Sequence, residues 1–255
     1  MQAHRSATLT ALIEIAVMFL PGIPAYLWVW HNVSGTMADI WQVVVYLYFL
    51  AGSLFIGLRR WNLDQLGLNR KGIALGLTCG SSLIVVLILG RLSIHLPIEP
   101  QSITIVRVLY DIVYYVGLVG LIEELLFRGL LYRVLDELRG VRLAIWGSAI
   151  AFGIYHIGGQ GIIGGLGTAF IGLIFALIRW RAGGIVGLIF VHGLYDIIAM
   201  EGWHNLDPSQ VMNQLQTIDR PLALACDAIL LSMILYLWKI HPRLMNRLDK
   251  RKTND

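Results

Sequence analysis

The stretch GLVGLIEELLFRGLLYRVL, residues 117–135, places two adjacent carboxylates, Glu123 and Glu124, inside an apolar run. Lipid cannot solvate charge, so ionisable residues in a membrane-type helix are costly and usually mark a functional site. Arg128 follows Glu124 by one helical turn, and these two side chains are therefore expected to pair. Glu123 points about 100° away around the helix. Its partners are therefore expected to come from another part of the chain.

The composition around this stretch is typical of an integral membrane protein. Of the 255 residues, 57% are hydrophobic and 14% are charged, whereas roughly 25% of the residues of soluble domains are charged. The two cysteines, Cys79 and Cys226, provide neither a disulfide framework nor a cysteine-based metal site. A net charge of +4 is modest, and we expect the lipid bilayer rather than a nucleic acid as the partner.

Apolar runs recur along the whole chain at lengths that approach or reach the roughly 20 residues of a membrane-spanning helix. The sequence therefore predicts an all-α fold: a polytopic membrane helix bundle of about eight transmembrane helices with a polar interior site. Residues 1–255 are expected to form a single integral membrane domain. The eight runs are 7–30, 40–58, 72–96, 104–127, 143–157, 162–179, 184–200 and 221–240.

Lys and Arg residues predict the orientation of these helices, because cytoplasmic loops carry an excess of them. Segments 59–71, 128–142 and 241–255 are rich in Lys and Arg, whereas the alternate loops have almost none. Both termini are therefore expected in the cytoplasm, with residues 241–255 as a basic tail. The short loops and the lack of a targeting extension favour a multi-pass protein of a bacterial or archaeal inner membrane.

Some local features allow more detailed expectations. Pro21 and Pro24 should kink or interrupt the first helix, because proline removes a backbone donor and clashes with the preceding turn. Residues 59–71 fit either an interfacial helix on the cytoplasmic leaflet or an ordinary basic loop. Residues 158–159, both glycine, are expected to form the turn between the fifth and sixth runs.

Two further groups of polar residues lie in other apolar runs. His156 lies in AFGIYHIGG, and His192 and Asp196 lie in FVHGLYD. His192 and Asp196 share a helix face because four residues separate them. Gathering these groups around Glu123 would remove the cost of exposing them to lipid. Two imidazoles and carboxylates around an open position suit a catalytic divalent metal, and a glutamate that takes a proton from water would complete a hydrolytic site.

Each of these residues also has a structural explanation. His156 alone could simply hydrogen-bond a backbone carbonyl, and His192 with Asp196 could form a neutral clasp between helices. Glu124 with Arg128 could be purely structural. The combination of all three groups is more specific than any one of them.

In this order and spacing, EELLFR (residues 123–128), FGIYH (152–156) and HGLYD (192–196) resemble the motifs of the CPBP intramembrane proteases. That family includes type II CAAX prenyl endopeptidases and bacteriocin-processing or bacteriocin-immunity proteins. The resemblance covers about residues 105–200. It implies an intramembrane endopeptidase whose substrate is a peptide or protein at the membrane, with or without an attached lipid.

The resemblance also implies a role for each residue. Glu123 would be the general base that activates water. His156 and His192 would be metal ligands or oxyanion-stabilising groups. Asp196 would be the fourth polar group, at a position where the eukaryotic prenyl endopeptidases carry Asn. Glu124 would be a secondary acid oriented by Arg128, with Phe152 in support.

Two questions stay open at this point. A divalent metal such as zinc, held by Glu123, His156, His192 and Asp196, fits the residue types. A metal-free site, in which Glu123 activates water while the histidines and Asp196 stabilise the oxyanion, fits them equally well. The same polar core also fits a non-catalytic membrane regulator or bacteriocin-immunity protein. Proton-coupled transport is weaker, because the sequence lacks paired interrupted helices.

The depth of the two central residues creates a tension. Glu123 lies near the cytoplasmic end of its run, whereas His156 lies at the far end of the next, roughly 20 Å of helix from Arg142. Helix tilt, or a fourth helix that continues through residue 138, would bring Glu123 and His156 to the same level. If neither holds, they cannot share a site.

Overall fold

The structure is a computed structural model that describes residues 2–93, 104–203 and 219–240, and this part of the chain contains helices and no strand. Within it, six helices are long and apolar enough to cross a membrane. Each of the eight expected apolar runs overlaps a helix, and the predicted all-α polytopic membrane fold is confirmed. The basic tail expected at residues 241–255 lies outside the described residues.

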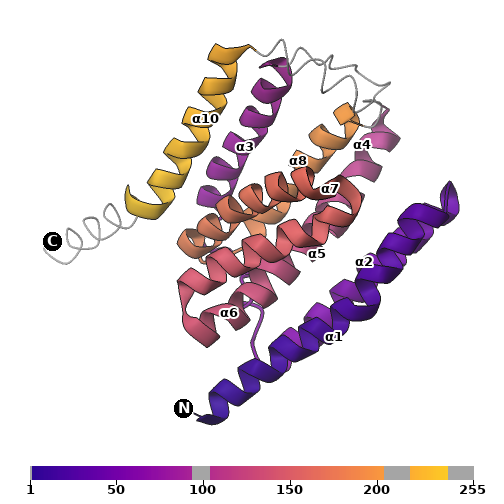
Figure 1. Ribbon diagram of the computed structural model, residues 1–255, viewed down its shortest axis with the longest axis vertical. Coiled ribbons are helices and arrows are strands. Elements are labelled where there is room, and N and C mark those ends of the chain that lie inside the picture. Colours follow the sequence, from indigo (N-terminus) through magenta and orange to yellow (C-terminus); the bar gives the residue numbers. More distant parts are fainter. Residues whose placement is uncertain (1, 94–103, 204–218, 241–255) are drawn as a thin grey trace, which may run out of the picture. The chain divides into compact units, whose positions relative to one another are not determined.

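Most elements are α-helices, and three, marked η, are π-helical segments with a wider winding (Figure 1). In chain order they are α1 (Gln2–Asn32), α2 (Thr36–Leu58), α3 (Ile73–Ser93), α4 (Ile105–Asp111), η1 (Ile112–Gly120), α5 (Leu121–Glu123), η2 (Glu124–Leu131), α6 (Tyr132–Arg139), α7 (Val141–Ala182), α8 (Val186–Trp203), α10 (Arg220–Leu235) and η4 (Tyr236–Ile240).

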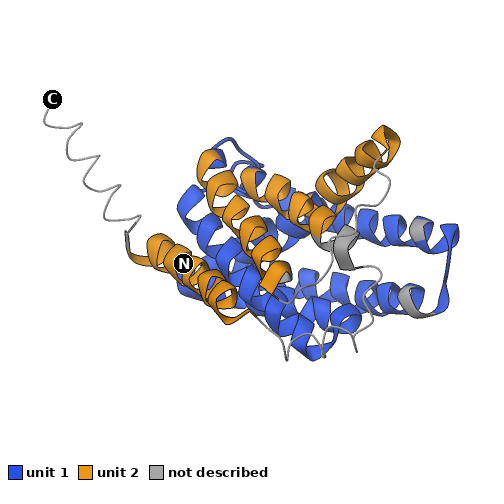
Figure 2. Cartoon of the chain, turned by 90° about the horizontal axis from the view of Figure 1, so that it is seen from above, with its two compact units in different colours: residues 1–73, 121–186 blue, residues 74–120, 187–255 orange. Residues whose placement is uncertain are grey.

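Contacts group the chain into two compact units, each of which joins segments that are distant in the sequence (Figure 2). Unit 1 comprises Met1–Ile73 and Leu121–Val186, and unit 2 comprises Ala74–Gly120 and Gly187–Asp255. Of the predicted site residues, unit 1 carries Glu123, Glu124, Arg128, Phe152 and His156, and unit 2 carries His192 and Asp196.

The motif EELLFR lies in the middle of a helix of 35 residues, Ile105–Arg139. At about 1.5 Å per residue this is about 50 Å of helix, longer than the roughly 30 Å of a bilayer's hydrocarbon core. Its winding is π-helical on both sides of Glu123, and such local widening is frequent at functional sites. The helix expected over the fourth apolar run therefore continues through residue 138. This is one of the two arrangements that would bring Glu123 level with His156.

In unit 1, helices α1, α2 and α7 pack around the part of this helix that begins at Leu121. α1 remains helical through Pro21 and Pro24, so the prolines do not interrupt it. Because proline removes one intrahelical hydrogen bond, this continuity depends on packing against the neighbouring helices. The result is a helix that accompanies the motif helix over its whole length in unit 1.

Helix α7 is a hairpin, because the chain reverses at Gly161, where φ is 70° and ψ is 179°. A Cβ on Gly153 would meet the carbonyl of Gly165 and the side chain of Ala169. Twelve residues along a straight helix would instead separate Gly153 from Gly165 by about 18 Å. The fifth and sixth runs are thus separate arms, and the turn expected at residues 158–159 lies at Gly161.

Replacing Gly161 should test how strongly this reversal depends on glycine. Its backbone conformation is essentially restricted to glycine, and we expect Gly161→Ala to cost about 1–3 kcal/mol of stability. Gly159→Ala is the matched control, because Gly159 is helical and a Cβ there would meet no atom within 4 Å. Thermal unfolding of the purified variants in detergent measures the difference. Equal melting temperatures for the two variants would contradict a glycine-dependent reversal.

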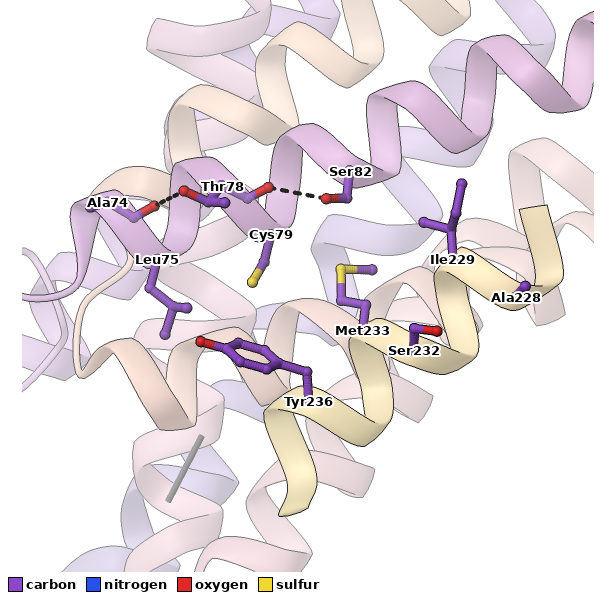
Figure 3. A pocket seen from close by; sticks show the side chains of 10 residues that line it. All are labelled: Ala74, Leu75, Thr78, Cys79, Ser82, Ala228, Ile229, Ser232, Met233 and Tyr236. Atoms are coloured by element: carbon purple, nitrogen blue, oxygen red, sulfur yellow. Dashed lines mark hydrogen bonds between the residues drawn. The ribbon is translucent and has the colours of Figure 1, made fainter. Parts of the chain in front are cut away.

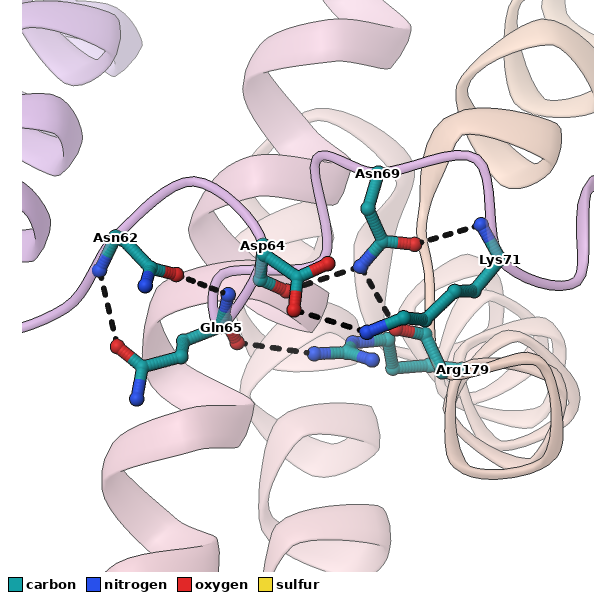
Figure 4. Close-up of polar contacts among 7 residues, drawn as sticks. Asn62, Asp64, Gln65, Asn69, Lys71 and Arg179 are labelled. Carbon is teal, nitrogen blue, oxygen red and sulfur yellow. Dashed lines mark hydrogen bonds and ion pairs between the residues drawn. The ribbon is translucent and has the colours of Figure 1, made fainter.

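Segment 59–71 forms a loop of turns rather than an interfacial helix (Figure 4). The side-chain amide of Asn69 donates to a carbonyl just after α7 at 3.2 Å, and Arg179 donates to the carbonyl of Gln65 at 3.2 Å. Leu66 is fully buried. Side-chain hydrogen bonds and one apolar anchor therefore fasten the basic loop to the end of α7, and its backbone groups are satisfied without a helix.

In unit 2, helix α8 packs closely against η1 and α3 through small residues. A Cβ on Gly193 would overlap Val116 of η1, and a Cβ on Gly120 would meet the carbonyl of Ile189. Small residues at such crossings let helix backbones approach closely in membranes. This packing fixes the position of the HGLYD motif relative to η1.

Candidate active site

Glu124 and Arg128 form a fully buried ion pair, as their spacing predicts. The Arg128 Nη1 lies 3.0 Å from Oε1 of Glu124, and both side chains have 0% exposure. The Arg128 Nη2 also donates to the carbonyl of Gly172 at 3.4 Å, and its guanidinium lies 4.1 Å from the ring centroid of Phe152. Glu124 is therefore held by a charge that is itself anchored to both arms of the α7 hairpin.

Glu123 and His156 come together although 33 residues separate them. Their closest atoms, Oε2 of Glu123 and Nε2 of His156, are 3.7 Å apart. Nδ1 of His156 lies 2.9 Å from the carbonyl oxygen of Phe152. The tautomer with its proton on Nδ1 donates to that carbonyl and turns the lone pair of Nε2 toward the carboxylate. The structural explanation of His156 and a role in chemistry are therefore compatible.

The separation of 3.7 Å between Glu123 and His156 limits what the pair can do. It is too long for a strong direct hydrogen bond, which would be about 2.7–3.2 Å. It is close to the distance between two ligands that each lie about 2.0–2.2 Å from one zinc ion, and it also leaves room for one shared water. Both side chains are mainly buried, so a water or ion held there would be shielded from lipid and bulk solvent.

The HGLYD motif forms its own local pair in unit 2. Nε2 of His192 lies 3.5 Å from Oδ2 of Asp196, one helical turn away, as the spacing predicts. His192 is buried, whereas Asp196 is partly exposed. Tyr115 of η1 lies close enough to Asp196 to interact with it electrostatically. A buried imidazole beside a more accessible carboxylate can act either as a ligand set or as a hydrogen-bonded clasp.

Metal-type side chains do not form a cluster within the described part of the chain: no group of three or more His, Cys, Asp or Glu side chains there is arranged to hold a metal ion. Glu123 and His156 belong to one unit, and His192 and Asp196 to the other. Each unit taken by itself therefore supplies two ligands, fewer than the three that a catalytic zinc site usually takes from the protein.

Several residues that hold this site were not identified from the sequence. Arg179 donates through Nε to the backbone carbonyl of Arg128 at 3.1 Å, and Phe175 stacks its ring 5.3 Å from the Arg128 guanidinium. In the sequence, the sign of this role is that Arg179, a charged residue, ends the apolar run 162–179.

A cavity of about 710 Å³ lies in unit 2 between α3 and α10 (Figure 3). The hydroxyls of Thr78 and Ser82 on its wall donate to backbone carbonyls one turn earlier in α3, at 2.7 and 3.2 Å. None of the motif residues lines it. Its wall also carries the thiol of Cys79 and the hydroxyls of Ser232 and Tyr236.

Comparison with known proteins agrees with the motifs. Residues 105–198 match the family model described as Type II CAAX prenyl endopeptidase Rce1-like. The match runs from α4 into α8, includes all three motifs, and confirms the resemblance to CAAX proteases. It covers less than half of the chain and leaves out α1, α2 and α3. No curated protein and no solved structure matches the chain.

Proposed function

We propose that this multi-pass membrane protein, whose residues 105–198 match a CAAX prenyl endopeptidase family, is an intramembrane endopeptidase. One observation carries the proposal: the buried carboxylate of Glu123 faces Nε2 of His156 across 3.7 Å. Two ionisable groups from different helices meet where a membrane protein would otherwise avoid them. The family match favours peptide hydrolysis over transport as the use of this pair.

The chemistry assigned to Glu123 is general-base catalysis. Its carboxylate takes a proton from a water molecule held between it and His156, and the water oxygen attacks the carbonyl carbon of the scissile peptide bond. The tetrahedral intermediate collapses when its C–N bond breaks, and the proton held by Glu123 passes to the leaving amine. Glu124, held by Arg128, keeps the adjacent turn rigid so that Glu123 stays aimed at the water.

His192 and Asp196 are proposed to complete this site by stabilising the oxyanion of the intermediate. The motif resemblance is the main support. Lipid-facing positions would leave His192 and Asp196 costly and without a use.

A divalent metal is compatible with these residues. Glu123, His156 and His192 would hold it, with Asp196 as a further oxygen donor, and it would polarise the scissile carbonyl or its bound water. The hydrogen bond from Nδ1 of His156 to a backbone carbonyl is the kind of contact that commonly orients metal-binding histidines. Zinc held in this way is our proposed alternative to the metal-free site, in which Glu123, the histidines and Asp196 act alone.

Elemental analysis should test the cofactor directly. Protein purified without chelator is expected to hold about one zinc per chain. His156→Ala and His192→Ala should each weaken zinc binding by about 100-fold, the upper end of the loss that follows removal of a ligand's outer-shell partner, because each removes a ligand itself. Glu14→Gln is the control, because Glu14 belongs to none of the three motifs and its carboxylate pairs with Arg60 at 2.8 Å. A metal-free preparation with full, chelator-resistant activity would instead favour Glu123 and the histidines acting without metal.

The function itself can be tested with purified protein in liposomes and a library of quenched peptides, with and without an attached isoprenoid. We expect cleavage of at least one membrane-associated peptide, and the library identifies whether a lipid is required. If the wild-type protein cleaves nothing while its cellular role survives loss of Glu123, His156 or His192, the chain is a non-catalytic regulator or immunity protein.

Protease protection of both termini in right-side-out cells tests the proposed cytoplasmic orientation in the cell membrane.

A further inference from the structure

Arg179 is a buried arginine near the end of α7, and its guanidinium bridges two backbone segments of unit 1. Its Nη2 donates to the carbonyl of Gln65 in loop 59–71 at 3.2 Å (Figure 4). Its Nε donates to the carbonyl of Arg128 in η2 at 3.1 Å. The guanidinium also lies 5.6 Å from the ring centroid of Tyr132, where α6 begins. Arg179 therefore joins the loop to the helix that carries the EELLFR motif.

The Arg128 carbonyl has lost its ordinary partner through the π-helical winding of η2. In an α-helix this carbonyl would accept from the N–H of Tyr132, four residues later. That N–H bonds instead to the carbonyls of Phe127 and Gly129. Backbone groups without a partner are costly within a membrane, and neighbouring side chains commonly supply the missing bond. Arg179 supplies it here, and it thereby favours the wider winding over an ordinary α-helix.

The backbone of the loop is shaped to hold the guanidinium in this position. Gly67 has a φ of 86°, and a Cβ there would lie 3.0 Å from Cζ and Nε of Arg179. The carbonyl of Gly67 accepts from the N–H of Ile185 at 2.7 Å. A Cβ on Gly129 of η2 would lie 2.9 Å from the carbonyl of Leu66. The loop therefore closes over Arg179 and touches η2 directly, one residue after the carbonyl that Arg179 holds.

We propose that Arg179 is a positioning residue: together with the loop it clamps the π-helical winding of η2, and so sets the direction in which Glu123 points toward His156. Glu123 directly precedes η2. The winding of η2 therefore fixes the rotation of the Glu123 side chain relative to the anchored loop. The catalytic part of the inference rests on the proposed peptidase function. The purely structural alternative is that Arg179 only adds stability to unit 1.

The variant Arg179→Lys keeps the positive charge but replaces the planar fork of donors by a single ammonium group. Small displacements of a catalytic group are costly, and we expect kcat for a quenched peptide to fall by about 30-fold with KM within about twofold. Arg142→Lys is the matched control, because Arg142 is an exposed arginine in the first turn of α7, and it should leave kcat unchanged. Unchanged kcat in Arg179→Lys, while Glu123→Gln is inactive, would overturn the inference alone.

Hydrogen–deuterium exchange measures the clamp without peptidase activity. The amides of residues 128–135 should exchange about tenfold faster in Arg179→Lys than in the wild type, because local opening of that backbone becomes easier, while those of α2 stay unchanged. Equal exchange at residues 128–135 would refute the clamp, and uniformly faster exchange across unit 1 would favour the structural alternative. Faster local exchange, in a chain whose wild type cleaves no peptide, would keep the clamp and refute the proposed function.

Gly129→Ala tests the same clamp if Arg179→Lys does not fold, because it leaves every charge in place. Its Cβ would push the carbonyl of Leu66, and with it the loop, away from η2. We expect the same local increase in exchange and a fall in kcat of about tenfold. Wild-type exchange at residues 128–135 together with wild-type kcat in Gly129→Ala would overturn the proposal.

Discussion

Glu123→Gln is expected to lower kcat for peptide cleavage at least 10³-fold while leaving the fold intact. A glutamine has nearly the same shape as the glutamate but cannot take a proton from water, and general-base catalysis contributes about 10²–10⁴-fold to rate. Glu123 is 4% exposed, so the neutral amide also removes a buried charge rather than creating one. The rate of quenched-peptide cleavage in liposomes, with the melting temperature measured in parallel, provides the test.

Glu14→Gln controls for the loss of a membrane-embedded carboxylate as such. Glu14 lies on α1, belongs to none of the three motifs, and pairs with Arg60 at 2.8 Å and with Arg59 at 3.6 Å. We expect this variant to retain kcat within a factor of two. A Glu123→Gln protein that keeps more than a tenth of the wild-type kcat would rule out Glu123 as the base.

Arg128→Met is expected to destabilise the protein by about 3–5 kcal/mol, because removing one member of a buried ion pair leaves an uncompensated charge. The lost contacts include the hydrogen bond to the Gly172 carbonyl and the stacking on Phe152. An effect of this size should lower the melting temperature in detergent by on the order of 10 °C. Expression and thermal unfolding of the purified variant measure it.

A double variant separates the unpaired charge from the lost packing. In Glu124→Gln/Arg128→Met no buried charge is left alone, and replacing a whole buried pair by neutral groups is often nearly neutral. The double variant should therefore recover most of the lost stability. If it unfolds at the same temperature as Arg128→Met, the arginine acts through packing and not through Glu124.

The sequence predicts the class of fold well because membrane insertion depends on length and hydrophobicity. It does not locate the reversal in α7, because several glycines lie close together there and each could form the turn. Contact between the two arms of the hairpin selects Gly161. It also leaves segment 59–71 undecided between helix and loop. Hydrogen bonds to Arg179 and the end of α7 decide that choice, and they belong to tertiary structure.

The site divides in the same way between local and distant contacts. Glu124–Arg128 and His192–Asp196 follow from a spacing of four residues on one helix. The approach of His156 to Glu123 could be expected only from the cost of leaving either side chain in lipid. The long helix Ile105–Arg139 removes the apparent difference between the depths of these two residues in the membrane.

The most direct test of the account is cleavage of a membrane-associated peptide in water enriched in ¹⁸O, followed by mass spectrometry of the fragments. The account predicts a single new fragment pair with the wild-type protein, one ¹⁸O atom in the new carboxyl group, and no fragments with Glu123→Gln. Intact peptide after incubation with folded wild-type protein, or the same labelled fragments from Glu123→Gln, would contradict it.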